Sequence, residues 1–237
     1  MNYQYKYDQV KLELAQRYLE ALQSVDLEDI YSDDYHSYHS GIFLAGPHES
    51  YFSGSMKVFI IGQETRGWRS GYCEAKQRQP ITLNGILTSM ESTLQFNLKS
   101  PRTSKFRQFY KAASKRLCIN SSNPSNAALW SNQFCVSYKG KNAVKSPKFR
   151  AIQKLSIQIL RAQFEILKPD IAVFTTGHGR DTYLKQCFTT YETIQIHKPK
   201  RLWEFMVGDV RCFRTNHPTW GGSNQFLREA VKHAATI

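Results

Sequence analysis

Short apolar runs, each followed by glycine or by polar residues, predict four strands of a buried sheet. The runs are Met56–Gly62, Ala127–Ser137, Ile171–Phe174 and Val210–Arg214. In the first, four apolar residues in a row (58–61) are closed by Gly62, a residue that permits a tight turn. Continuous runs of this kind are typical of strands that are covered on both faces in a parallel sheet.

Apolar residues at intervals of three and four predict amphipathic helices around these strands. One helix precedes the first strand, and others are expected over 81–96, from Ser104, from Ser146-Pro147 to Pro169, after Gly177 and after Ser223. In the helix from Ser104, we expect the apolar side chains Phe106, Phe109, Tyr110, Ala113 and Leu117 to be buried. The opposite side would carry the basic side chains Lys105, Arg107, Lys111, Lys115 and Arg116.

Strands that alternate with helices predict an α/β fold, with a central, mainly parallel four-stranded sheet between two helical layers. Residues 1–40 are expected to form an N-terminal helical extension, and residues 41–237 the α/β domain itself. No apolar run approaches the roughly 20 residues of a membrane span, so we expect no membrane partner.

The net charge of +13 adds a functional indication. A polyanion is the expected partner, and nucleic acid is the commonest one, although a basic protein without such a partner is the alternative. The five cysteines are widely spaced and form no CxxC pair, which argues against a disulfide framework, a zinc ribbon and an iron–sulfur cluster. We therefore expect a monomeric protein of the reducing cytoplasm, without metal or cofactor.

Polar residues follow or end each predicted strand: Gln63-Glu64, Asn132, Thr176-Gly177 and Asn216-His217. In open α/β sheets, ligands bind beyond the carboxyl ends of the strands. Each cluster alone has an ordinary structural explanation, such as helix capping by Glu64 or a structural role for His217. Together, a glutamate, an asparagine and a histidine at one edge of the sheet make a plausible active site.

The order of these segments resembles that of the uracil-DNA glycosylase superfamily. GQET (62–65) is similar to its GQDPY motif, and PITLNGI (80–86) is similar to its P-x-S-L-x-N-I segment. LWSN (129–132) resembles the strand that ends in a base-reading asparagine, and NHPTW (216–220) resembles the HPSP motif. The four segments are collinear and, with the last helix, span residues 56–235, which is most of the chain.

The resemblance implies a role for each matching residue. Glu64 would orient water and stabilise the positive sugar, and His217 would donate a hydrogen bond to the departing base. Asn132 and Gln63 would bind the base, and Trp68 or Tyr72 would stack on it. The residues expected to contact DNA are Thr82, Thr219, Trp220, Lys105 and Arg107.

Two residues that differ from the family pattern bear on which base is the substrate. Thr65 and Arg66 replace the proline and tyrosine of GQDPY, and that tyrosine helps the family to exclude bases with a 5-substituent. We therefore expect a DNA glycosylase, with Arg66 at the base, that acts on a modified or damaged pyrimidine rather than strictly on uracil. The alternatives are a non-catalytic DNA-binding module of the same fold and another nucleotide hydrolase, although neither a P-loop nor a metal-binding carboxylate cluster is evident.

Overall fold

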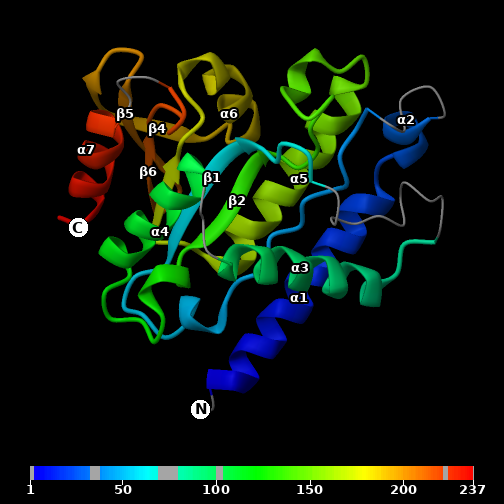
Figure 1. Ribbon diagram of the computed structural model, residues 1–237, viewed down its shortest axis with the longest axis horizontal. Coiled ribbons are helices and arrows are strands. Elements are labelled where there is room, and N and C mark those ends of the chain that lie inside the picture. The colour runs from blue at the N-terminus through cyan, green and yellow to red at the C-terminus, as the bar shows by residue number, and fades with distance from the viewer. Residues whose placement is uncertain (1–2, 33–37, 69–79, 100–103, 221–223, 237) are drawn as a thin grey trace. The chain divides into compact units, whose positions relative to one another are not determined.

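The structure is a computed structural model that describes residues 3–32, 38–68, 80–99, 104–220 and 224–236. These residues form seven α-helices and one six-stranded sheet with the strand order β2-β1-β3-β6-β5-β4 (Figure 1). Short 3₁₀ turns lie at Glu49–Tyr51, Pro124–Asn126, Ala143–Lys145 and His178–Arg180. The predicted α/β class is confirmed.

The centre of the sheet is parallel. β1 (Val58–Glu64) pairs with β3 (Ile171–Phe174), which pairs on its other side with β6 (Val210–Arg214). β5 (Leu202–Val207) and β4 (Tyr191–Lys198) continue the sheet as antiparallel strands. β2 (Leu129–Phe134) is next to β1 at the other end of the sheet. All four predicted strands are therefore present.

The prediction of four strands is wrong, because β4 and β5 were missed. β4 is an edge strand in which only Tyr191 and His197 are half-buried and the other residues are exposed. A strand without a buried face has no apolar run, so it lacks the signal that identified the others. Three basic residues at its end, Lys198, Lys200 and Arg201, made the segment look irregular, and charge of this kind is common at sheet edges.

Contacts within the chain define two compact units. The first comprises residues 1–46, 64–96 and 132–167, and the second comprises residues 47–63, 97–131 and 168–237. Residues 1–40 therefore share a unit with α3 and α5, described below. Whether they also form a separate extension of the fold stays a prediction.

In the second unit, helices cover both faces of the strands. α4 (Lys105–Leu117) and α7 (Asn224–Ala234) pack on one face through a cluster that includes Val58, Ile60, Ile171, Val173, Phe213, Phe106, Tyr110, Ala230 and Val231. Because side chains alternate along a strand, Phe174 points to the opposite face. There it contacts Phe188, the residue after α6 (Asp181–Cys187), with ring centroids 6.2 Å apart.

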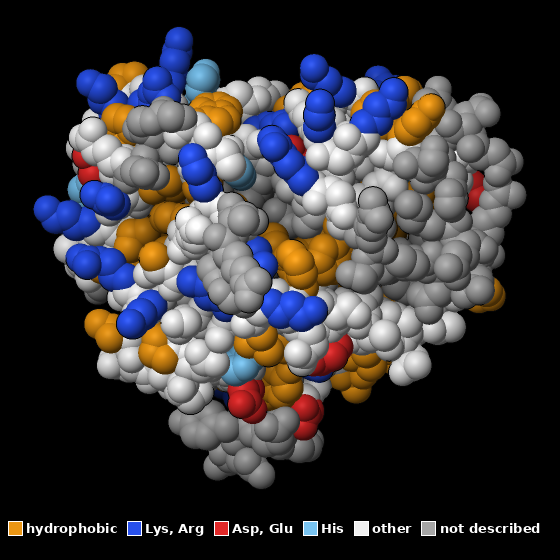
Figure 2. Space-filling view, in the orientation of Figure 1, with side chains coloured by type: hydrophobic (Ala, Val, Ile, Leu, Met, Phe, Trp, Pro, Cys, Tyr) orange, Lys and Arg blue, Asp and Glu red, His pale blue; other side chains and the backbone are white. Residues whose placement is uncertain are grey.

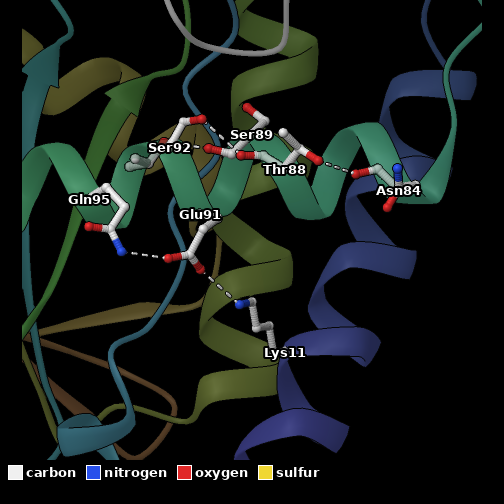
Figure 3. A network of polar contacts seen from close by, with 8 residues as sticks. Lys11, Asn84, Thr88, Ser89, Glu91, Ser92 and Gln95 are labelled. Atoms are coloured by element: carbon white, nitrogen blue, oxygen red, sulfur yellow. Dashed lines mark hydrogen bonds and ion pairs between the residues drawn. The ribbon is translucent and has the colours of Figure 1, made fainter.

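The first unit contains α1 (Tyr3–Gln23), α2 (Leu27–Tyr31), α3 (Leu83–Leu98) and α5 (Phe149–Leu167). The buried Tyr18 hydroxyl of α1 accepts a hydrogen bond from Gln163 of α5 and donates one to the Ala45 carbonyl, both at 2.9 Å. An ion pair of 3.1 Å between Lys11 and Glu91 joins α1 to α3 (Figure 3). The predicted helices are thus confirmed in this unit.

Four of the cysteines lie in the described part of the chain: Cys118, Cys135, Cys187 and Cys212. All four are free and buried. Cys73 lies outside the described residues. Among the described helices, none combines the length and apolar character that crossing a membrane requires.

Candidate functional site

Three chain segments are held together at the carboxyl ends of β1, β3 and β6 in the second unit. The backbone ladder runs past the strands, since Thr215 N–H donates to the Phe174 carbonyl at 2.8 Å and Gly177 N–H donates to the Thr215 carbonyl at 2.9 Å. Gln63 Nε2 of β1 donates to the Thr176 carbonyl at 2.7 Å. We call Gln63, Thr176, Gly177, Thr215, Asn216, His217 and Trp220 the strand-end cluster.

His217 is half-buried and is held on two sides. Its ring is nearly parallel to that of Phe106 in the first turn of α4, at a centroid distance of 6.1 Å and an interplanar angle of 15°. Its Nδ1 lies 2.7 Å from Thr219 Oγ1 and 3.3 Å from the backbone nitrogen of Thr219. A backbone N–H can only donate, so Nδ1 is an acceptor. In the neutral imidazole the proton is therefore on Nε2, which becomes the donor.

Trp220 closes the turn that begins at His217. Its N–H donates to the His217 carbonyl at 3.0 Å, and its ring lies on Gly177. A Cβ at position 177 would be 3.0 Å from the ring, and the residue has a φ of +74°. Both the contact and the backbone conformation therefore require glycine here. The Trp220 side chain is nevertheless 41% exposed.

Several polar side-chain atoms of the strand-end cluster are buried without a hydrogen-bond partner among the described residues. Asn216 is 0% exposed, and neither its Oδ1 nor its Nδ2 has a partner there. The hydroxyls of Thr176 and Thr215 are in the same condition. The sequence put Asn216 beside His217 in a polar cluster but indicated no role for it, because burial and missing partners leave no trace in the sequence.

An ion pair supports the segment between β3 and α6. Arg214, the last residue of β6, is 3% exposed, and its Nε and Nη2 lie 2.8 and 2.9 Å from the carboxylate of Asp181. Burial lowers the pKa of Arg214, although Asp181 opposes the shift, and burial also outweighs Arg214 in raising the pKa of Asp181. The pair fixes the start of α6 to the strand that leads to His217.

Glu64 and Asn132 belong to the first unit, whereas Gln63 and His217 belong to the second. Glu64 is half-buried at the last position of β1. Asn132 is 6% exposed, and its Nδ2 has no partner among the described residues. It lies inside β2 rather than at its end, which corrects the predicted position. That Glu64 and Asn132 form one site with His217 stays a prediction.

Of the two aromatic residues expected to stack on the base, Trp68 is buried and Tyr72 is not described. Trp68 is 6% exposed and packs edge-on against Phe43 and Phe96, with ring centroids 5.2 and 5.3 Å away. It is a core residue, because flanking apolar rings bury it despite the polar segment that follows. Tyr72 lies outside the described residues. Arg66 is exposed.

The residues expected to contact DNA divide into exposed and buried ones. Lys105 is exposed, as are Thr82 and Thr219. Thr82 Oγ1 accepts the Gly85 N–H at 3.1 Å and so caps the start of α3. Arg107 corrects the prediction, since it is 8% exposed and its guanidinium donates to the Lys99 carbonyl. Its aliphatic stem is covered at the first turn of α4, so the helical spacing gave the wrong side.

Lys111 is also partly withdrawn from the basic face of α4. Its Nζ donates to Asn126 Oδ1, and burial, together with the nearby charge of Arg107, lowers the pKa of Lys111 to about 8. Lys105, Lys115 and Arg116 are the exposed cations of this helix. On the face drawn in Figure 2, Lys and Arg side chains predominate over Asp and Glu. A polyanion would therefore meet exposed positive charge.

Two further features of the described residues are the arrangement of their metal-ligating side chains and a groove in the first unit. Among these residues, no group of three or more His, Cys, Asp and Glu side chains is arranged to hold a metal ion. A groove of about 270 Å³ in the first unit is lined by residues of α1 and α5 and by Ser24. Two of its polar pairs are already joined, Arg17 with Glu165 at 2.6 Å and Ser24 with Gln158 at 2.7 Å.

No protein-family model matches the chain, and no curated protein matches it either.

Proposed function

We propose that the protein is a DNA glycosylase, which flips a base out of DNA and hydrolyses its N-glycosidic bond. The observation that carries this proposal is the fixed tautomer of His217. Thr219 N–H occupies Nδ1, so a neutral His217 presents Nε2–H as a donor beyond the end of β6. The collinear segments that resemble the uracil-DNA glycosylase superfamily give the donor its chemical context.

Cleavage of an N-glycosidic bond separates charge, because the sugar becomes positive and the leaving base becomes negative. A donor that is already oriented stabilises the negative charge as it develops and needs no reorganisation during the reaction. In the proposal His217 has this role, with Phe106 and Thr219 limiting the rotation of its ring. Glu64 is proposed to act on the other side of the bond, where it orients water and stabilises the sugar.

The proposed substrate class is a modified or damaged pyrimidine in DNA. The exposed Arg66 stands where the resemblance leads one to expect a tyrosine that excludes bases with a 5-substituent. Arginine is longer than tyrosine and always charged, so it suits polar groups on an enlarged base. The charge of +13 supports DNA as the carrier of that base, with an affinity that falls steeply as salt rises.

The proposal is tested by single-turnover release of bases from a panel of oligonucleotides. The panel contains uracil, thymine and 5-substituted uracils, in single strands and opposite guanine or adenine, and is run with and without a chelator. We expect release from at least one modified pyrimidine, unchanged by chelation. Salt-dependent DNA binding without release from any member of the panel would contradict the proposal and favour a non-catalytic DNA-binding module.

A further inference from the structure

The unpaired amide of Asn216 is the feature of the strand-end cluster that the proposed function leaves unused. A buried polar group without a partner costs about 1–3 kcal/mol, so such groups are rare in folded proteins. Within the described part of the strand-end cluster, three side chains share this condition: Asn216 with both of its polar atoms, and Thr176 and Thr215 with their hydroxyls. They lie at the ends of two adjacent parallel strands, β3 and β6. Thr176 and Asn216 follow the paired residues Phe174 and Arg214 by two positions, so their side chains share one face of the sheet and Thr215 points to the other. The unpaired groups of Thr176 and Asn216 point to a ligand that completes them.

We propose that Asn216, with Thr176, binds the polar edge of the flipped base. An asparagine amide offers an acceptor and a donor side by side, and this pair matches the adjacent donor and acceptor atoms on the edge of a nucleobase. The inference rests on the proposed function, because that function supplies the base. It adds a second base-reading asparagine, from β6, to the one that the resemblance assigns to Asn132.

The base reaches Asn216 only when a neighbouring group moves, because Asn216 is 0% exposed. Trp220 is the group that moves in this proposal. Its ring lies on Gly177, the residue after Thr176, and is already 41% exposed, so only part of its area has to be uncovered when it leaves this position. An aromatic ring beside the entering base also provides a stacking surface. Trp220 thus replaces the buried Trp68 as the proposed stacking partner.

The test compares binding with stability in the variant Asn216→Leu, which is apolar and close to asparagine in shape. DNA affinities are measured with two kinds of duplex, in which guanine faces either a 2′-fluoro nucleotide that resists cleavage or a tetrahydrofuran that lacks a base. The bases are uracil, thymine and 5-hydroxymethyluracil. We expect wild-type protein to prefer DNA with a base, and Asn216→Leu to reduce this preference by about tenfold or more.

Stability distinguishes a ligand site from a structural amide. Replacing an unpaired buried amide by an apolar group of similar shape is neutral or stabilising, so the urea midpoint of Asn216→Leu should equal or exceed that of the wild type. Asn97→Leu is the matched control. Asn97 is also buried and its Oδ1 also lacks a partner among the described residues, but its Nδ2 donates to the Tyr110 hydroxyl at 2.8 Å. This control should lower the midpoint and keep the preference for DNA with a base.

The outcomes separate this inference from the proposed function. Base release together with an unchanged preference in Asn216→Leu overturns the inference and leaves the function in place. A preference that depends on Asn216, without base release from any substrate, supports the base site and overturns the function. A wild type that binds both duplexes equally, or an Asn216→Leu variant with a lowered midpoint, overturns the inference. If the leucine variant does not fold, Asn216→Asp provides the same binding comparison with an unchanged shape.

Discussion

The sequence and the structure assign different roles to the hydroxyl of Thr219, and a substitution at this residue distinguishes them. The family resemblance predicts that it contacts a DNA phosphate, whereas in the structure its Oγ1 lies 2.7 Å from His217 Nδ1. Thr219→Val removes the hydroxyl and keeps the backbone N–H that also contacts Nδ1 at 3.3 Å. His217 then keeps its tautomer but is oriented by one hydrogen bond fewer.

The size of the effect follows from that single bond. A neutral hydrogen bond contributes about 0.5–1.5 kcal/mol net, so its loss should slow single-turnover base release roughly 2- to 12-fold. Because Thr219 is exposed, the free energy of unfolding should change by about 0.5 kcal/mol or less. Binding of DNA that resists cleavage should not change, since the hydroxyl is assigned to His217 and not to a phosphate.

The assay pairs the single-turnover rate with the dissociation constant for the 2′-fluoro duplex at fixed salt. Thr88→Val is the matched control, because the exposed Thr88 hydroxyl donates to the Asn84 carbonyl within α3 at 2.9 Å. It should change the free energy of unfolding by about 0.5 kcal/mol or less and leave the release rate unchanged. A Thr219→Val variant that binds DNA more weakly but releases base at the wild-type rate would refute the positioning role.

Three further predictions concern other parts of the chain. Trp68→Ala should cost about 3–5 kcal/mol in urea unfolding and leave base preference unchanged, because Trp68 is a core residue; a stable variant with altered preference would contradict this. Burial acts to raise the pKa of Glu204, but hydrogen bonds of 2.6 Å from His197 and Arg211 outweigh burial and lower the pKa. The Glu204 carboxylate therefore stabilises the fold above about pH 4.5. Glu204→Gln should therefore cost about 2 kcal/mol at pH 7, and the difference from wild type in urea unfolding should shrink as the pH falls below that value; a difference that does not vary with pH would argue against the pairing. Arg66→Tyr should narrow base release toward unmodified uracil, whereas weaker DNA affinity with unchanged preference would place Arg66 at the DNA backbone.

Strands with an apolar run could be predicted from the sequence, including the edge strand β2, whereas β4 and β5 could not. In β5, the buried Glu204 interrupts the apolar residues. Val58–Ile61 and Ile171–Phe174 are continuous apolar runs because both of their faces are covered. In β4, Ile194 is 47% and Ile196 is 59% exposed, so the hydrophobic residues of this strand do not form a buried face. β4 is specified by pairing with its neighbour β5, and such pairing is not visible in local sequence.

Candidate site residues were proposed from their type and position, but their burial could not be predicted from the sequence. His217 was identified from its place after a strand, yet its contacts with Phe106 and Thr219 depend on how α4 and the turn at 217–220 are placed. Trp68 was assigned to ligand contacts because the segment that follows it is polar, and Arg107 because helical spacing put it on the basic side of α4. Both are buried, since helical or loop geometry turned each side chain toward apolar partners or a backbone carbonyl. Tyr72 lies outside the described residues.

The central claim is that His217 assists the departure of a base from DNA. Its most direct test is the single-turnover release rate of His217→Ala, with Glu64→Gln as the partner variant and His178→Ala as an exposed histidine control. We predict that each of the first two variants lowers the rate about 100-fold or more, with DNA binding nearly intact and His178→Ala unaffected. His217→Ala should also be impaired less on a base that leaves easily. Release at the wild-type rate by both His217→Ala and Glu64→Gln would contradict the account.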